Sequence, residues 1–269
     1  MKTRQNKVSA RPGRLAAALI ILLAPAGAAR ADMSWTARTT TTVLVNGQDR
    51  TLQEETRQFR LKKNVLREDH LDSGVTRFFN FQNRTMVMVN LQTKFYAVLS
   101  FADLTRQINQ ERAALQRDLD NRERRLAGMD QQNRALAAAQ LEAEREKLKL
   151  WSGTYSVSPS EERAEINSHP CRKHLGTSNG AAFQEIWVAE DIEIDADYSN
   201  FFARGMASLD RREHGHLTLV NGFPVRVVSR YGPVTVTVNH TDLSLDKVPV
   251  EAFILPRDLK PSPRLTNSP

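Results

Sequence analysis

Residues 35–61, WTARTTTTVLVNGQDRTLQEETRQFRL, decide the fold class of this chain. The stretch Trp35 to Val45 is rich in threonine and valine, whose branched side chains favour β-strands. It stops at Asn46-Gly47, a dipeptide that strongly indicates a two-residue hairpin turn. Thr51 to Leu61 is typical of the returning strand. The sequence therefore predicts an antiparallel hairpin at the start of the folded domain.

Further strand-like runs follow the hairpin. Turn residues separate them, for example at Asp72-Ser73-Gly74 and Gln82-Asn83-Arg84. This spacing predicts an antiparallel meander that extends to Phe101. Its four further strands are Val65 to His70, Val75 to Phe81, Met86 to Leu91 and Lys94 to Leu99.

Residues 102–150 contain no proline and are dominated by good helix formers. Their apolar residues recur at steps of four and seven and so form a narrow stripe, as in a coiled coil. Gly128-Met129-Asp130 provides a helix stop and a new N-cap. A single rod would expose the stripe over ~75 Å, so we predict two antiparallel helices. The stripe consists of Leu104, Ile108, Leu115, Leu119 and Leu126, followed by Leu136, Leu141, Leu148 and Leu150.

Strand signals resume after Trp151. Gly176 to Gly180 is typical of a hairpin loop, and Asp197 to Leu209 is predicted to be a short amphipathic helix. The tail beyond Pro256 is rich in proline and is predicted to be disordered. The predicted strands are His169 to Leu175, Ala182 to Val188, His216 to Val220, Phe223 to Tyr231 and Val234 to His240.

These elements predict an α+β fold, with a curved antiparallel sheet, or half-barrel, an inserted helical hairpin and a short extra helix. We expect one β domain over residues 32–255, the insert at 102–150 and the tail at 256–269. If the helices cover the apolar face of the sheet only in part, a hollow remains that can bind an apolar ligand; a filled core is the alternative. The candidate lining residues are Phe79, Phe81, Met86, Met88, Tyr96, Ile186 and Val227.

The first 31 residues have the pattern of a secretory signal. Met1 to Arg14 is basic, Leu15 to Leu23 is apolar, and Ala29-Arg30-Ala31 matches a cleavage site. The apolar run is far shorter than the ~20 residues of a membrane span. We therefore expect a periplasmic or secreted protein that is cleaved near Ala31 and has no transmembrane span.

The basic character of the chain lies mainly in this signal. The net charge is +7, but residues 1–31 hold six of the 38 basic residues and none of the 31 acidic ones. In the helical segment, arginines alternate with acidic residues, which indicates a solvated, internally paired surface. Nucleic acid is therefore not an expected partner.

Cys171 is the only cysteine, so no intramolecular disulfide can form. Asp32 rather than a cysteine follows the cleavage site, which argues against a lipid anchor on this chain. We predict that Cys171 is buried and inert; reactivity or pairing between chains is the alternative.

No residue pattern predicts catalysis convincingly. Gly176 to Gly180 matches the G-x-S-x-G nucleophile elbow around Ser178, but a strand rather than a helix is expected to follow it. His214-Gly215-His216 and the segment His169 to His174 contain possible metal ligands, yet neither has a clear third and fourth ligand. We therefore predict a non-enzymatic protein without a metal or cofactor.

Three segments carry a resemblance to a known family: Leu126 to Arg134, Ser168 to His174 and Glu185 to Asp191. Together with the order of the strands, they resemble an uncharacterised family of exported bacterial proteins that is similar to the LolA-like superfamily of lipoprotein carriers. The resemblance implies a curved antiparallel sheet with helices over its hollow, and core positions for Ile166 and Trp187. No residue of a known site carries over.

The resemblance implies a periplasmic binding or carrier protein for an apolar ligand, either a lipid or an acylated protein. The alternative is an envelope interaction or scaffold protein that docks a partner through the helical insert. In that case the sheet would be only a packed support.

Overall fold

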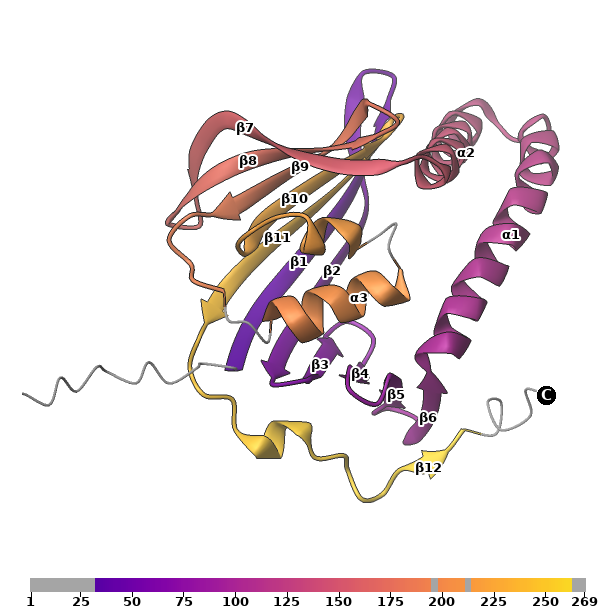
Figure 1. Cartoon of the computed structure of the whole chain (residues 1–269). Helices are drawn as coiled ribbons and strands as arrows, with labels where there is room; N and C mark the ends of the chain where they lie inside the picture. The colour runs from indigo at the N-terminus through magenta and orange to yellow at the C-terminus, as the bar shows by residue number, and fades with distance from the viewer. Residues whose placement is uncertain (1–31, 195–197, 211–213, 263–269) are drawn as a thin grey trace, which may run out of the picture.

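The computed structural model describes residues 32–194, 198–210 and 214–262, which form one twelve-stranded sheet with helices packed against it (Figure 1). The predicted signal, residues 1–31, lies outside the described residues. The strand order is β12-β6-β5-β4-β3-β2-β1-β11-β10-β9-β8-β7. The strands are β1 (Asp32–Val45), β2 (Gln48–Lys62), β3 (Val65–His70), β4 (Val75–Asn80), β5 (Thr85–Asn90), β6 (Phe95–Ser100), β7 (Tyr155–Ile166), β8 (His169–Ser178), β9 (Ala181–Ala189), β10 (Pro224–Tyr231), β11 (Val234–Ser244) and β12 (Lys260–Pro261).

Strand β1 lies in the middle of the sheet and joins two meanders. It pairs antiparallel with β2 on one side and with β11 on the other. At the β1–β2 turn, Asn46 and Gly47 have φ angles of 53° and 77°. A two-residue hairpin turn of this kind needs positive φ at both positions, which Asn-Gly supplies at low cost. The predicted hairpin and the meander through β6 are confirmed.

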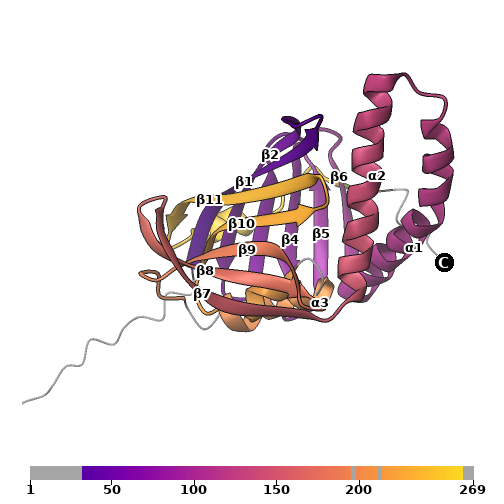
Figure 2. The same ribbon diagram turned by 90° about the horizontal axis from the view of Figure 1, so that it is seen from above.

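The helical insert folds back on itself as predicted. Helix α1 (Phe101–Leu126) and helix α2 (Gln131–Ser152) are joined by a short turn in which Asp130 is the N-cap of α2 and accepts a hydrogen bond from the Asn133 amide. The two helices are linked by ion pairs such as Arg122 to Glu144, at 2.8 Å. Figure 2 shows the hairpin standing beside the sheet. None of the described helices has the length and apolar character needed to cross a membrane.

Short helical elements fill the connection between β9 and β10. They are η1 (Tyr198–Ala203), α3 (Arg204–Leu209) and η2 (Gly215–Thr218). The predicted helix at Asp197 to Leu209 is confirmed for its described residues, and Asp197 lies outside them. The predicted strand at His216 to Val220 was wrong. The His216 carbonyl accepts hydrogen bonds from the amides of Leu219 and Val220, which closes a turn, and β9 pairs directly with β10, which leaves no place for a strand between them.

Two hydrophobic clusters hold the layers together. In the first, Trp35 stacks on Phe59 with ring centroids 4.9 Å apart, and Phe202 and Phe223 pack edge-on against it. In the second, α2 covers the ends of β1 and β10 through apolar contacts. The residues of this second cluster include Val43, Val45, Ala143, Leu150, Phe183, Tyr231 and Val234.

The sheet is neither closed nor strongly curled, which corrects the expectation of a curved half-barrel. Helices α1, η1 and α3 pack against its apolar face, so strong curvature is not needed to bury that face. The sheet also has an edge strand that was not predicted. β7 is mostly polar and exposed, and its pairing with β8 is irregular between Pro159 and Arg163, so its sequence lacks apolar alternation.

The predicted disorder of residues 256–269 was wrong for the residues that the structure describes. β12 pairs in parallel with β6, and the amides of Lys260 and Ser262 donate to the carbonyls of Lys94 and Tyr96. Backbone pairing, which composition does not reveal, orders this segment. Residues 263–269 lie outside the described part.

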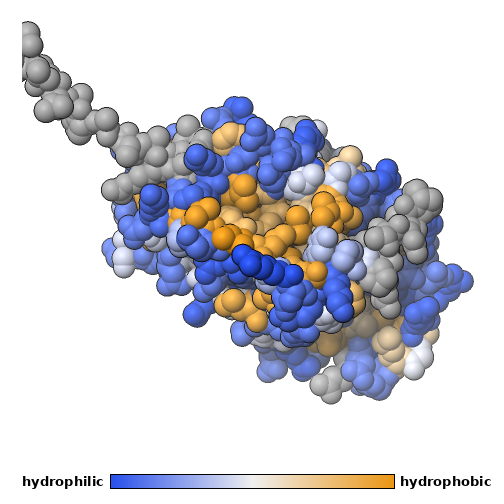
Figure 3. Space-filling model, turned by 90° about the horizontal axis from the view of Figure 1, so that it is seen from below, coloured by the Kyte–Doolittle hydropathy of each residue, from blue (hydrophilic) through white to orange (hydrophobic). Residues whose placement is uncertain are grey.

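The underside of the molecule, where β6 and the segment from η3 (Val250–Phe253) to β12 lie, carries exposed apolar side chains. Figure 3 shows apolar residues gathered there in a hollowed area with hydrophilic residues around it. Val98, Val250 and Ile254 are large exposed apolar residues of these elements. We call the apolar area that Figure 3 shows the underside patch.

Candidate functional site

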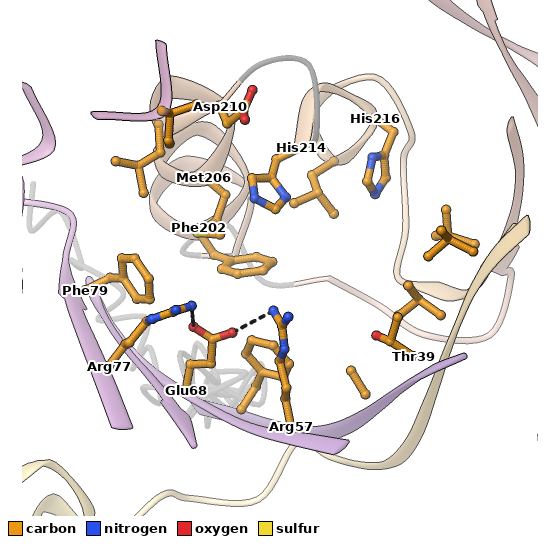
Figure 4. Close-up of a pocket in the computed structure, with 18 of the residues that line it drawn as sticks. Thr39, Arg57, Glu68, Arg77, Phe79, Phe202, Met206, Asp210, His214 and His216 are labelled. Carbon is orange, nitrogen blue, oxygen red and sulfur yellow. Dashed lines mark hydrogen bonds and ion pairs between the residues drawn. The ribbon is translucent and has the colours of Figure 1, made fainter. Parts of the chain in front are cut away.

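A cavity of about 640 Å³ lies between the sheet and the helices. The sheet face that lines it carries Trp35, Phe59 and Met88, and we call it the inner face. Helices α1, η1, α3 and η2 line the opposite side (Figure 4). Sites for small-molecule ligands usually have volumes of roughly 300–1,000 Å³, so the cavity is large enough for a ligand.

Most of the cavity wall is apolar. Alternate residues of a strand share one face, so each strand contributes every second side chain. Methionines stand among the lining residues, and their flexible side chains can re-pack around differently shaped ligands. The main apolar lining residues are Trp35, Phe59, Phe79, Met86, Met88, Leu99, Leu104, Ile108, Phe202, Met206, Leu217, Phe223, Val227 and Val238.

A charged group interrupts this apolar wall. Glu68 of β3 lies between two arginines of the neighbouring strands, with 3.0 Å from Arg57 Nη1 to its Oε1 and 3.4 Å from Arg77 Nη1 to its Oε2. The Glu68 side chain is only 6% exposed. We call Arg57, Glu68 and Arg77 the charge cluster; Figure 4 shows it on the sheet side, with Phe202 and Met206 on the helical side.

The charge cluster keeps Glu68 ionised although it is buried. Burial raises the pKa of this carboxyl, but the nearby His70 imidazole and the charges of Arg77 and Arg57 outweigh that effect and lower the pKa to about 2. Nε2 of His70 lies 3.2 Å from Glu68 Oε1. A negative charge beside two arginines and an imidazole is therefore part of the cavity wall at neutral pH.

Three histidines also line the cavity. His214 and His216 come from the helical side, and His240 comes from β11. Burial lowers the pKa of His240 to about 4, although the hydrogen bond to the Pro224 carbonyl opposes this shift. The His240 ring is therefore neutral at pH 7 and donates that bond through Nδ1. Within the described residues, no group of three His, Cys, Asp or Glu side chains could hold a metal ion.

Four of the seven lining residues expected from the sequence do line the cavity: Phe79, Met86, Met88 and Val227. Ile186 is fully buried beside Val227, and Phe81 is buried against Phe101 and Phe202, so both belong to packed core. Tyr96 pairs with Val89, one residue along from Met88, and therefore faces the other side of the sheet. These three residues do not line the cavity.

The charge cluster was not predicted from the sequence. One signal was present, because Glu68 and Asp69 are adjacent within a predicted strand and must point to opposite faces. Each is held by two arginines: Asp69 binds Arg60 at 2.6 Å and Arg67 at 2.9 Å on the outer face. A strand with charges on both faces indicates that the inner face is not a purely apolar core.

The G-x-S-x-G segment is a hairpin end and not a nucleophile elbow. Ser178 is buried in the last position of β8, and its Oγ donates to the Leu150 carbonyl at 2.7 Å. The turn residues Asn179 and Gly180 have positive φ angles, and β9 follows at once. Ser178 therefore caps the end of α2 and is not presented to a substrate.

Cys171 is 1% exposed, as the sequence analysis predicted. Burial raises the pKa of its thiol, so little thiolate forms at neutral pH. We expect a chromogenic disulfide reagent to react with less than about a tenth of the thiol in the native protein and with all of it in denaturant. Fast stoichiometric labelling without denaturant would show that Cys171 is accessible.

Gly205 allows helix α3 to approach the sheet closely. A Cβ at this position would lie 2.2 Å from Phe81 Cδ1, in a ring that packs between Phe101 and Phe202. We expect Gly205→Ala to lower the free energy of unfolding by about 1–2 kcal/mol, because overpacking outweighs the better helix propensity of alanine. Urea unfolding measures this loss of stability. Arg204→Ala, at an exposed position of the same helix, is the control. A Gly205→Ala protein as stable as the control would contradict the close contact.

The comparisons with known proteins give no function. No family model matches the sequence, and no curated protein sequence matches it. Among solved structures, the fold is similar to that of an uncharacterized conserved protein from Thermus thermophilus, with 10% identity, a TM-score of 0.41, and coverage of 85% of this chain and 89% of that one. A DUF1329 family protein from Desulfovibrio piger is similar at 9% identity and a TM-score of 0.30, over 86% and 92% of the two chains. Neither protein is named as a lipoprotein carrier.

Proposed function

We propose that this protein is a non-enzymatic binding or carrier protein that holds an apolar ligand, a lipid or the acyl chain of a modified protein, in its cavity. The observation that carries the proposal is the cavity of about 640 Å³ between the inner face and the helices, with its mostly apolar wall. Contact of an apolar chain with the apolar part of this wall removes apolar surface from water, which favours binding. The resemblance to the LolA-like carriers agrees with this proposal.

The position of the cavity supports reversible binding. One side of its wall is the sheet, whose strands are fixed by continuous backbone pairing. The other side consists of α1 and the short segments η1, α3 and η2, which pack on the sheet through buried aromatic side chains such as Phe202. The two sides of the wall can move apart without any break in the backbone pairing of the sheet. We propose that a ligand enters between the sheet and these short segments.

Export is part of the proposal. The signal-like pattern of residues 1–31 supports the proposal that the protein works in the periplasm or outside the cell. An apolar ligand that must cross an aqueous compartment needs a soluble carrier, because each exposed methylene costs about 0.8 kcal/mol in water.

The proposal is tested by filling the cavity. Met88 lines the cavity, whereas the adjacent Val87 points to the opposite face of the same strand. The purified protein is titrated with a neutral naphthylamine fluorophore that becomes bright in apolar surroundings. We expect the wild type and Val87→Trp to bind it and Met88→Trp to bind about tenfold more weakly or worse, because the larger ring occupies the ligand volume.

Extraction of the protein from its native envelope provides the second measurement. Organic solvent is expected to release a stoichiometric amount of a lipid or acylated species from the wild type and a much smaller amount from Met88→Trp. Mass spectrometry measures both amounts. The carrier proposal would be refuted if the wild-type protein yielded no lipid and did not bind the fluorophore.

The second candidate function is docking of an envelope partner. The observation in its favour is the underside patch, since exposed apolar patches often mark interaction sites. The helical insert offers less support, because its first half lines the cavity and α2 covers the second hydrophobic cluster. The test is cross-linking in cells with two variants, Val98→Asp and a chain whose helical hairpin is shortened around Gly128. A partner that is lost in Val98→Asp but retained in the shortened chain would favour docking through the patch.

A further inference from the structure

The inner face of β2 to β6 has an apolar end and a charged end. Residues directly opposite one another on neighbouring strands form rows across the sheet. One row is apolar throughout: Leu61, Leu66, Phe79, Met86 and Leu99. The next row on the same face is Phe59, Glu68, Arg77, Met88 and Ala97. The two rows are about 7 Å apart along the strands, so charges and an apolar surface lie within the length of one small ligand.

Arg77 has hydrogen-bonding capacity to spare. A guanidinium carries five N–H donors. Among the described residues, Arg77 makes one hydrogen bond, to Glu68, at the long distance of 3.4 Å. Its side chain is 34% exposed and lines the cavity. Figure 4 shows its end within the space below Phe202.

The acidic groups of the cavity wall are already engaged. Glu68 accepts from Arg57 and Arg77, Glu55 pairs with Arg57, and Asp210 pairs with Arg112. On α1, Glu111 accepts a hydrogen bond from the Gln107 side chain. At Glu68, Glu55 and Asp210, a cationic ligand would compete with an arginine that is already bound. An anionic group can use the free donors of Arg77 without breaking any of these pairs.

Building on the carrier function proposed above, we infer that the ligand is amphipathic, with a carboxylate or phosphate group bound by Arg77 and an apolar chain along Phe79, Met86 and Leu99. The planar guanidinium matches the paired oxygens of both anions. Neither a free small anion nor an uncharged hydrocarbon uses both ends of the site.

The test compares ligands that share one chain and differ only in the head group. The affinities of dodecanoate, dodecyl phosphate and dodecanol are measured by displacement of the naphthylamine fluorophore. Inorganic phosphate, which has no chain, is measured in the same way. We expect the wild type to bind at least one of the two anionic amphiphiles about tenfold or more tightly than dodecanol, since hydrogen bonds to charged groups are among the strong ones. We expect inorganic phosphate to compete poorly. The preferred anion identifies the source as a fatty acid or a phosphate-bearing lipid.

Arg77→Gln is expected to remove most of the preference for the anion over dodecanol. Arg60→Gln is the matched control, because Arg60 holds Asp69 on the outer face of the same strands at 2.6 Å. It is expected to keep the wild-type preference. If Arg77→Gln does not fold, Arg77→Lys keeps the charge without the planar fork and is expected to show a reduced preference. The anion preference of the wild type should also fall as salt is raised.

The outcomes separate this inference from the carrier proposal. Equal affinity of the wild type for dodecanol and both anions would overturn the inference and leave the carrier function standing. Tight binding of inorganic phosphate alone would overturn it as well, in favour of a small-anion site. If no chain of any kind binds, the carrier proposal itself fails.

Discussion

Replacement of Trp35 by alanine is expected to lower the free energy of unfolding by about 3–5 kcal/mol. Trp35 is 4% exposed and stands at the centre of the aromatic cluster, stacked on Phe59 and met edge-on by Phe202 and Phe223. The substitution removes the β1 ring that contacts Phe59 of β2, Phe202 of η1 and Phe223, the residue before β10. It also joins the lost volume to the existing cavity, so the neighbouring rings lose contacts on two sides.

Urea unfolding followed by circular dichroism measures this loss. Trp35→Phe keeps a ring at the position and is expected to lose less than half as much. Val98→Ala, at an exposed position of β6, is expected to change stability by no more than about 0.5 kcal/mol. A loss below about 1 kcal/mol for Trp35→Ala would show that the aromatic cluster does not hold the helices on the sheet.

Glu68→Gln is the second substitution with a large expected effect. It keeps the shape of the side chain but leaves Arg57 and Arg77 without their shared carboxylate. Removal of one member of a buried ion pair typically costs about 3–5 kcal/mol. The cost here is expected at the low end of that range, because Arg57 and Arg77 are about one-third exposed and Arg57 keeps its pair with Glu55. We expect a loss of about 3 kcal/mol at pH 7. Glu161→Gln, at a side chain that is 91% exposed, serves as the control and should be nearly neutral.

The effect of Glu68 should depend on pH in a defined direction. Its pKa falls from 4.5 to about 2 on folding, so its ionised form stabilises the folded state. That contribution is fully present above about pH 5 and is lost as the pH falls through 4.5 toward 2. The stability difference between the wild type and Glu68→Gln should therefore shrink between about pH 5 and pH 2. A difference that stays constant over this range would mean that the pKa of Glu68 does not change on folding.

Local sequence signals predicted the elements that depend on local geometry. Asn46-Gly47 predicted the first hairpin because positive φ at two successive positions suits few other dipeptides. Asp130 predicted the start of α2 because its side chain can accept from the amide three residues on. The strand β3 was predicted from Val65 to His70, which are its observed bounds.

Elements that depend on distant partners were not predicted. β7 is an edge strand whose sequence is nearly all polar, so alternation gives no signal there. β12 is ordered by pairing with β6, which lies far earlier in the chain, and tail composition cannot reveal such a partner. For the same reason the sequence did not show that the sheet is not strongly curled, although helices over one of its faces were expected.

The candidate site was predicted only in its apolar part. Alternation identified Phe79, Met86, Met88 and Val227, because residues two apart on a strand share a face. It did not separate them from Ile186, which has the same pattern but is covered by packed neighbours. The charge cluster needs three strands in register, and register between strands is a tertiary property.

The central claim is that the cavity takes up an apolar chain, and a chain-length series tests it most directly. Isothermal titration of the wild type with n-alkyl carboxylates of increasing length should show affinity rising about three- to fourfold for each added methylene, as expected for about 0.8 kcal/mol of burial. The rise should end when the chain fills the cavity, and it should end earlier in Met88→Trp. Absence of binding, or an affinity that does not change with chain length, would contradict the account.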